Sequence, residues 1–83
     1  NEFANQQLEI EYEKAMEQYK NFKKIYLLKK DTFEKNFNQY QEQILPLDKL
    51  LISQNDLLIS EINLVNALAN IGFSKNNIVI NNN

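Results

Sequence analysis

The sequence contains no cysteine, no histidine and no tryptophan, and its 83 residues include a single glycine and a single proline. Without cysteine there is neither a disulfide framework nor a thiolate metal site, and without histidine the commonest metal ligand and general base is missing. Carboxylates that share a helical face, such as Glu9 and Glu13, have no histidine or glycine-rich loop to work with. We therefore expect no enzyme, no cofactor and no metal site.

Long apolar runs and an excess of positive charge are also missing. The longest apolar run, Ile25-Tyr26-Leu27-Leu28, is far shorter than the roughly 20 residues of a membrane-spanning helix, so we expect no helix to cross a bilayer. The formal net charge is −2. Lysines and aromatic residues alternate between Tyr19 and Lys35, but the aromatic residues follow a packing stripe and glutamates lie nearby. This segment is therefore interpreted as a solvated helix flank and not as a nucleic-acid surface.

The residues before Pro46 repeat their apolar side chains at helical spacing. The steps alternate between four and three, which is the spacing of a coiled-coil seam. The seam residues are Leu8, Tyr12, Ala15, Tyr19, Phe22 and Tyr26, continued by Lys30, Phe33, Phe37, Tyr40 and Ile44. The two successive steps of four on either side of Tyr26 predict a stutter in the coiled coil. We predict a helix over residues 3–43.

The residues after Pro46 also predict a helix, with an apolar and a polar side. Apolar residues spaced by seven define the apolar face: Leu50, Leu57, Leu64 and Ile71, with Leu51, Leu58 and Val65 beside them. A separate polar stripe consists of Lys49, Ser53, Asp56, Ser60, Asn63 and Asn70. The stripe is either a solvated face or a place where the small residues Ser53, Ser60 and Ala67 let another backbone approach closely. We predict a helix over residues 47–74.

The end of the chain has several interpretations, one of which is a short extended segment over Ile78-Val79-Ile80 that joins a sheet elsewhere in a longer protein. Gly72 suits the left-handed residue that terminates a helix, yet Lys75 and Ile78 still keep the helical period. We predict that the helix ends between Gly72 and Asn77, with an irregular tail over residues 75–83 and disorder over residues 81–83.

A turn over residues 44–46 joins the two helices. Proline disfavours helical conformation in the preceding residue and suits the first position of a helix, where Asp48 then favours the positive end of the helix dipole. The chain is therefore predicted to be all-α, a long antiparallel helical hairpin or coiled coil with its corner at residues 44–47. Ile44, Leu45 and Leu47 make the corner apolar. They either fold inward and staple the helix ends or form a docking tip for another protein.

The segment from Tyr40 to Glu61, YQEQILPLDKLLISQNDLLISE, resembles the last periplasmic hairpin of the TolC-like outer membrane efflux proteins. The features shared with that family are an aromatic residue, a short turn and an aliphatic helix with small-residue–Gln pairs. The matching positions are Tyr40, the turn Gln43 to Pro46, Leu50, Leu51, Ser53, Gln54, Leu57, Leu58, Ser60, Leu64 and Ala67. The family's turn usually has glycine where this chain has Gln43, and some members place a gating arginine near Leu45.

The resemblance implies a segment of a homotrimeric channel in the outer membrane of a Gram-negative bacterium. Long helices of such channels pack side by side into a periplasmic tunnel, and the hairpin tips meet a periplasmic adaptor protein. Carried over by position, the adaptor-docking tip comprises Gln43, Ile44, Leu45, Pro46, Leu47 and Asp48. The polar stripe Lys49, Ser53, Asp56, Ser60, Asn63 and Asn70 would face the aqueous duct. The chain would then be a fragment whose membrane-embedded part lies elsewhere in the protein.

A free-standing coiled-coil module that scaffolds other proteins is the alternative hypothesis. A channel segment should expose apolar residues on two sides of each helix, whereas a free-standing hairpin should hide one side and leave the other to water.

Overall fold

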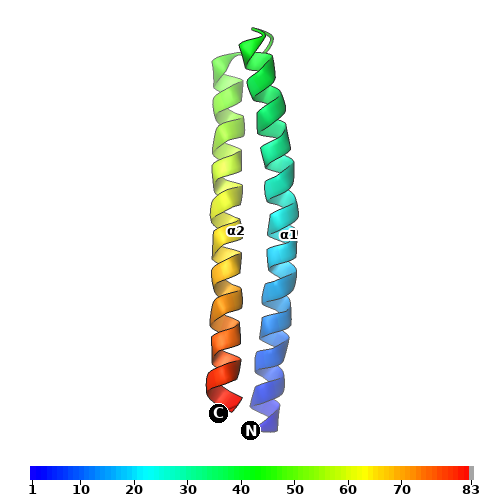
Figure 1. Cartoon of the computed structure of the whole chain (residues 1–83), viewed down its shortest axis with the longest axis vertical. Coiled ribbons are helices and arrows are strands. Elements are labelled where there is room, and N and C mark those ends of the chain that lie inside the picture. Colours follow the sequence, from blue (N-terminus) through cyan, green and yellow to red (C-terminus); the bar gives the residue numbers. More distant parts are fainter. Residues whose placement is uncertain (83) are drawn as a thin grey trace.

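The computed structural model describes residues 1–82 and consists of two long antiparallel helices joined by one tight turn (Figure 1). Helix α1 spans Glu2–Gln41 and helix α2 spans Leu47–Asn82. The molecule measures 62 × 14 × 13 Å, and both chain ends lie at the same end of the rod. The described residues contain no strand. The predicted all-α hairpin is confirmed.

The start of α2 agrees with the prediction, whereas α1 ends two residues earlier than predicted and α2 ends later. Helix α1 ends at Gln41 and α2 begins at Leu47. The predicted irregular tail is wrong, because α2 continues through Gly72 as far as Asn82. Ser74 and Ile78 beyond the glycine are partly buried, and this burial offsets the roughly 1 kcal/mol that glycine costs within a helix. Of the residues expected to be disordered, 81 and 82 are helical and 83 lies outside the described residues.

The turn stops α1 with a Schellman motif. The amide of Ile44 donates to the carbonyl of Gln39 at 2.8 Å, and the amide of Gln43 donates to the carbonyl of Tyr40 at 3.0 Å. Gln43 sits at the left-handed position of this motif with φ of 63°. Glycine usually occupies that position, because a side chain with a Cβ atom is strained there. The sharp turn of the hairpin therefore contains a glutamine in a backbone conformation that glutamine does not favour.

Replacing Gln43 with glycine is expected to stabilise the hairpin. The left-handed conformation costs a residue with a Cβ atom about 1–2 kcal/mol, and glycine loses part of that gain through its extra freedom in the unfolded chain. We expect the free energy of unfolding to rise by about 0.5–1 kcal/mol in urea titrations followed by circular dichroism. Glu42→Gly is the matched control, since Glu42 has φ of −82°. Equal effects of the two glycines would contradict this explanation.

Pro46 was predicted to suit the first position of the second helix, but it lies one residue before that position. The carbonyl of Pro46 accepts from the amides of Lys49 at 3.2 Å and Leu50 at 3.3 Å, so Pro46 occupies the N-cap position instead of the first helical position. Asp48 lies in the first turn, as predicted.

The seam of α1 is an uninterrupted heptad pattern, and the predicted stutter is wrong. The predicted seam residues from Leu8 to Tyr26 are at least partly buried, as expected. After Tyr26 the steps of three and four continue through Lys29, Phe33 and Asn36. Phe33 and Asn36 are partly buried, and Lys29, although exposed, pairs with Asp56 of α2. Asn36 therefore occupies a seam position where Phe37 was expected, and Lys29 one where Lys30 was expected. Each of them has a polar partner on α2.

Small side chains form the centre of the contact between the helices. The buried residues are Ala15, Leu50, Ser53, Ser60 and Ala67. All of these except Leu50 are small, which allows two helix backbones to approach closely. The hydroxyl of Ser60 donates to the carbonyl of Leu57 at 2.7 Å. The interpretation of the polar stripe as a solvated face is wrong for Ser53 and Ser60. It agrees with the exposure of Lys49 and Asn70.

Helix α2 is also long and apolar enough to cross a membrane by length and composition alone. An 18-residue window within Leu47–Asn81 has a mean hydropathy of 1.3, and 11% of the window is buried. This finding concerns length and composition only, so the expectation that no helix crosses a bilayer stays a prediction. The polar residues of α2 are mainly uncharged serines and asparagines, and they divide its apolar residues into short runs. The length of the longest apolar run therefore underestimates the mean hydropathy of this helix.

Candidate functional site

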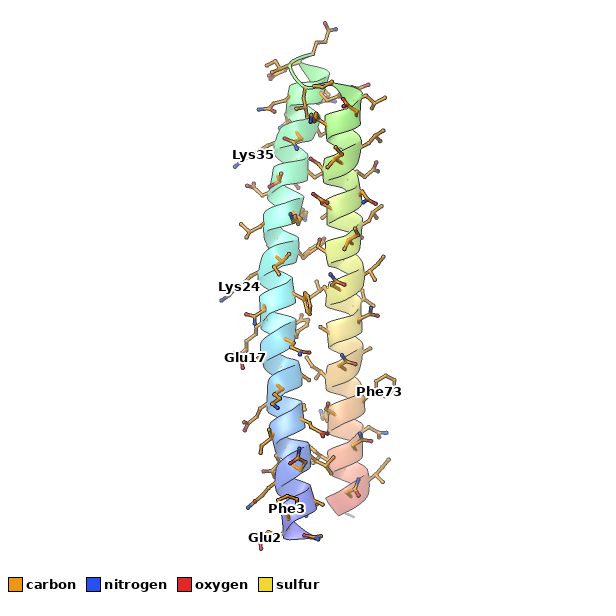
Figure 2. All side chains as sticks on the ribbon, turned by 180° about the vertical axis from the view of Figure 1, so that it is seen from behind. Glu2, Phe3, Glu17, Lys24, Lys35 and Phe73 are labelled. Carbon is orange, nitrogen blue, oxygen red and sulfur yellow. The ribbon has the colours of Figure 1, made fainter. Side chains whose placement is uncertain are left out.

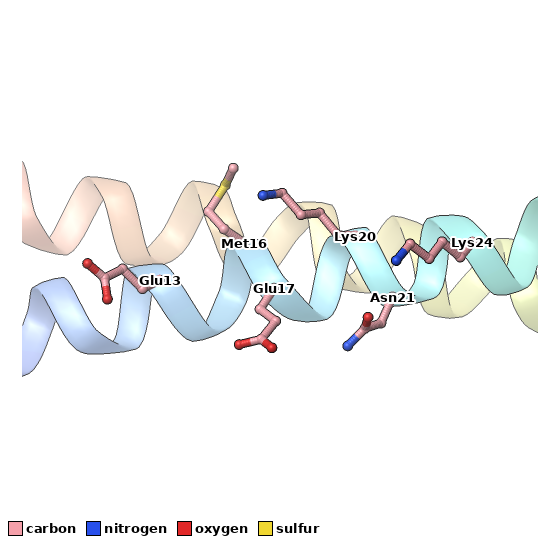
Figure 3. Close-up of a pocket in the computed structure, with 6 residues that line it drawn as sticks. All are labelled: Glu13, Met16, Glu17, Lys20, Asn21 and Lys24. Carbon is pink, nitrogen blue, oxygen red and sulfur yellow. The ribbon is translucent and has the colours of Figure 1, made fainter.

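Surface hollows on the hairpin are shallow. One hollow of about 500 Å³ lies entirely on α1, as Figure 3 shows. Its lining residues are Glu13, Met16, Glu17, Lys20, Asn21 and Lys24. Among the described residues, no cluster of three or more histidine, cysteine, aspartate or glutamate side chains is arranged to hold a metal ion. The surfaces that remain as candidate sites are the tip, the polar contacts between the helices and the outer faces.

The candidate tip divides into an inward and an outward part. Leu45 is partly buried, whereas Ile44 is 68% exposed and Leu47 is 51% exposed. Gln43, Pro46 and Asp48 are exposed as well. The inward alternative therefore agrees with Leu45 alone, whereas Ile44 and Leu47 leave apolar surface exposed at the tip. Docking of another protein at the tip stays a prediction.

Two polar contacts join the helices within the seam. The side-chain amide of Asn36 donates to the hydroxyl of Ser53, and Lys29 Nζ lies 4.0 Å from Asp56 Oδ2. The side chains of Lys29 and Asp56 are both nearly half exposed, so this ion pair stabilises the fold by at most about 1 kcal/mol. Polar pairs at seam positions mainly fix the register of two helices, because a shifted register would leave them without partners.

The residues of the polar stripe are thus not brought together as one surface. Ser53 and Ser60 lie between the helices, Asp56 and Asn63 lie at the edge of the contact, and the two end residues are exposed. Sequence reasoning missed Lys29 and Asn36 as partners of this stripe. The signal was present, because steps of three and four run without a break from Tyr26 to Tyr40.

The outer side of α2 is apolar along most of the rod. Ten apolar residues of this helix beyond the tip point outward with at least half of their surface exposed, and the first three of them were expected to form one face with the seam leucines. They are Leu51, Leu58 and Val65, together with Ile52, Ile59, Ile62, Leu68, Phe73, Val79 and Ile80. On α1 the exposed apolar residues are fewer: Phe3, Ile10, Ile25, Leu27, Leu28, Phe37 and Tyr40. Exposed apolar residues in this number make the outer side of α2 a candidate interaction surface.

The accessible surface is large for the size of the chain. It amounts to 6415 Å², whereas a compact monomer of this mass exposes about 5,200 Å². The excess of about 1,200 Å² is more than the roughly 800 Å² that each partner contributes to a standard protein–protein interface. No large side chain is fully buried in the described residues. The hairpin therefore has surface to contribute to a larger assembly.

Comparison with known protein families, with characterised proteins and with solved structures finds no match to this chain.

Proposed function

We propose that the hairpin is a protein-interaction element that assembles side by side with further helices. The observation that carries this proposal is the apolar outer side of α2, which runs from Leu51 to Ile80 over most of the 62 Å rod. Water is a poor environment for such a surface, and covering it by another helix removes apolar area from water at about 25 cal/mol per Å². A hairpin by itself has no third helix to cover this side.

In the first form of this proposal, the hairpin belongs to the wall of a trimeric TolC-like outer membrane efflux channel. The outer side of α2 would pack against neighbouring helices of the tunnel, and Ile44 and Leu47 would dock the hairpin tip of a periplasmic adaptor protein. Support comes from exposed apolar residues on both helices, which is what a channel segment requires. Ser53 and Ser60 would not face the duct in this form, since α1 covers them.

In the second form, the hairpin is a coiled-coil module that brings proteins together without a channel. The polar contacts Asn36–Ser53 and Lys29–Asp56 favour this form, because they specify the pairing of α1 with α2 inside the hairpin itself. The two forms make different demands on the outer side of α1. In a tunnel wall, the outer side of α1 contacts water or other helices. In a coiled-coil module, the same side binds a partner protein.

Fractionation of source cells tests the first form. An antibody against the hairpin is expected to detect, on a denaturing immunoblot, an outer membrane band several times heavier than 9.8 kDa. Antibodies against a known outer membrane protein and a known soluble protein control the fractionation. A soluble band at 9.8 kDa would contradict the channel and leave the coiled-coil module.

A further inference from the structure

The outer side of α1 carries a second stripe with heptad spacing, opposite the seam that contacts α2. Its members follow each other at steps of three and four: Ile10, Glu13, Glu17, Lys20, Lys24 and Leu27. All six side chains are exposed. Figure 2 shows Glu17 and Lys24 on the side of α1 that points away from α2. This stripe therefore has the spacing of a coiled-coil seam but no helix opposite it within the hairpin.

The stripe is complementary to itself when it is reversed. Read backwards about a point between residues 18 and 19, Glu17 meets Lys20, Glu13 meets Lys24 and Ile10 meets Leu27. We infer that α1 pairs through this stripe with α1 of a second copy of the chain, running antiparallel about a two-fold axis near residues 18 and 19. Each pair occurs twice in such an isologous contact. The pair therefore has four ionic contacts at its centre and an Ile–Leu contact on either side.

Residues beside the stripe fit the same arrangement. In an antiparallel coiled coil of this register, Glu9 of one copy lies beside Lys30 of the other, which adds an ionic contact at each end. Met16 and Lys23 flank the centre without bringing like charges together. A parallel pair in register would instead place Glu13, Glu17, Lys20 and Lys24 each opposite its own copy. Like charges at such distances are repulsive, so the charge pattern selects the antiparallel orientation.

The surface has room for an approaching helix. The hollow of about 500 Å³ at Glu13 to Lys24 in Figure 3 adjoins a second hollow of about 460 Å³ at Lys24, Leu27 and Leu28. Both lie on α1 and together they follow the stripe. Side chains of the second copy fill such hollows as knobs fill holes in a coiled coil.

This inference deepens the coiled-coil form of the proposed function, because copies in a trimeric channel wall run parallel. It depends on α1, whereas the general proposal of lateral assembly depends on the outer side of α2. The two fail separately: self-association through α2 would preserve lateral assembly and exclude the antiparallel α1 pair.

Charge reversal of the stripe tests the pairing. In sedimentation equilibrium at concentrations up to about 1 mM, we expect the full chain to reach twice its 9.8 kDa mass. Glu13→Lys with Glu17→Lys makes all four central contacts repulsive and should weaken the dimer about 100-fold or more. Lys20→Glu with Lys24→Glu should do the same. An equimolar mixture of these two double variants should form heterodimers, because every central contact is again between opposite charges.

Glu42→Lys with Glu61→Lys is the matched control, since it changes the net charge equally at exposed positions outside the stripe. It should leave the dimer unchanged within about threefold. A wild-type chain that stays monomeric would overturn the inference. So would a dimer that the stripe variants do not weaken, or one whose double variants fail to recover on mixing.

Disulfide trapping tests the orientation, because the described chain has no cysteine of its own. In the antiparallel pair, position 10 of one copy lies opposite position 27 of the other and about 25 Å along the axis from its own copy. Ile10→Cys mixed with Leu27→Cys should therefore give a cross-linked heterodimer on oxidation. Each variant alone should give no cross-link. Efficient cross-linking of Ile10→Cys to itself would show a parallel pair and overturn the inference.

Discussion

Leucine at both Ser60 and Ala67 is expected to unfold a large part of the hairpin population. These two residues are each 3% exposed and lie where α1 and α2 approach closely. Each leucine adds bulk at a buried position of the helix contact, which costs about 1–3 kcal/mol per site. The sites are two helical turns apart, so the effects should add to about 2–6 kcal/mol. A chain of 83 residues has about 4–12 kcal/mol of stability in total.

Urea titration followed by circular dichroism measures this effect at a fixed protein concentration. Ala69→Leu is the control, since Ala69 is exposed on the same helix two residues from Ala67. The control should change the free energy of unfolding by no more than about 0.5 kcal/mol. If Ala67→Leu and Ala69→Leu gave the same stability, the close approach of the helices at Ala67 would be refuted.

Aspartate at both Ile44 and Leu47 is expected to abolish adaptor binding in the channel form of the proposed function. Both side chains are at least half exposed at the tip, so the substitutions should leave the helices intact. Each removes apolar surface and introduces a charge that a docked partner would have to desolvate, which is costly at the centre of an interface. The readouts are adaptor binding and export by the protein that contains this hairpin, with helicity checked by circular dichroism.

Gln43→Asp separates the two causes, because it adds a carboxylate at the tip and leaves both apolar side chains in place. We expect it to retain most of the adaptor binding. Leu45 is left unchanged in this design, since it is partly buried and its loss would loosen the turn itself. Normal export by the Ile44→Asp, Leu47→Asp variant would rule out tip docking.

The two-helix architecture could be predicted from local patterns. Steps of three and four on each side of a single proline are enough to predict two helices and a corner, because helical periodicity and the effect of proline act within a few residues. The same patterns indicated an apolar corner. They did not show that Leu45 points inward while Ile44 and Leu47 point outward, because that depends on how the chain bends at Gln43.

The candidate surfaces depended on how the two helices are rotated about their axes. Sequence periodicity identifies stripes but not which stripe of α2 meets α1, and it left open whether the serines face water or a neighbouring backbone. The structure places Ser53, Ser60 and Ala67 in the contact and leaves Leu51, Leu58 and Val65 outside. Close backbone approach and the polar partners of Asn36 and Lys29 explain that choice.

The sequence by itself determined that this protein is a helical hairpin with a corner near Pro46, because periodicity and helix breaking are local properties of the chain. Only the tertiary structure decided where α2 ends, which residues form the contact and which apolar surface remains uncovered. Those features depend on contacts between residues far apart in the sequence, where packing of the whole seam outweighs the local preference of a residue such as Gly72 or Gln43.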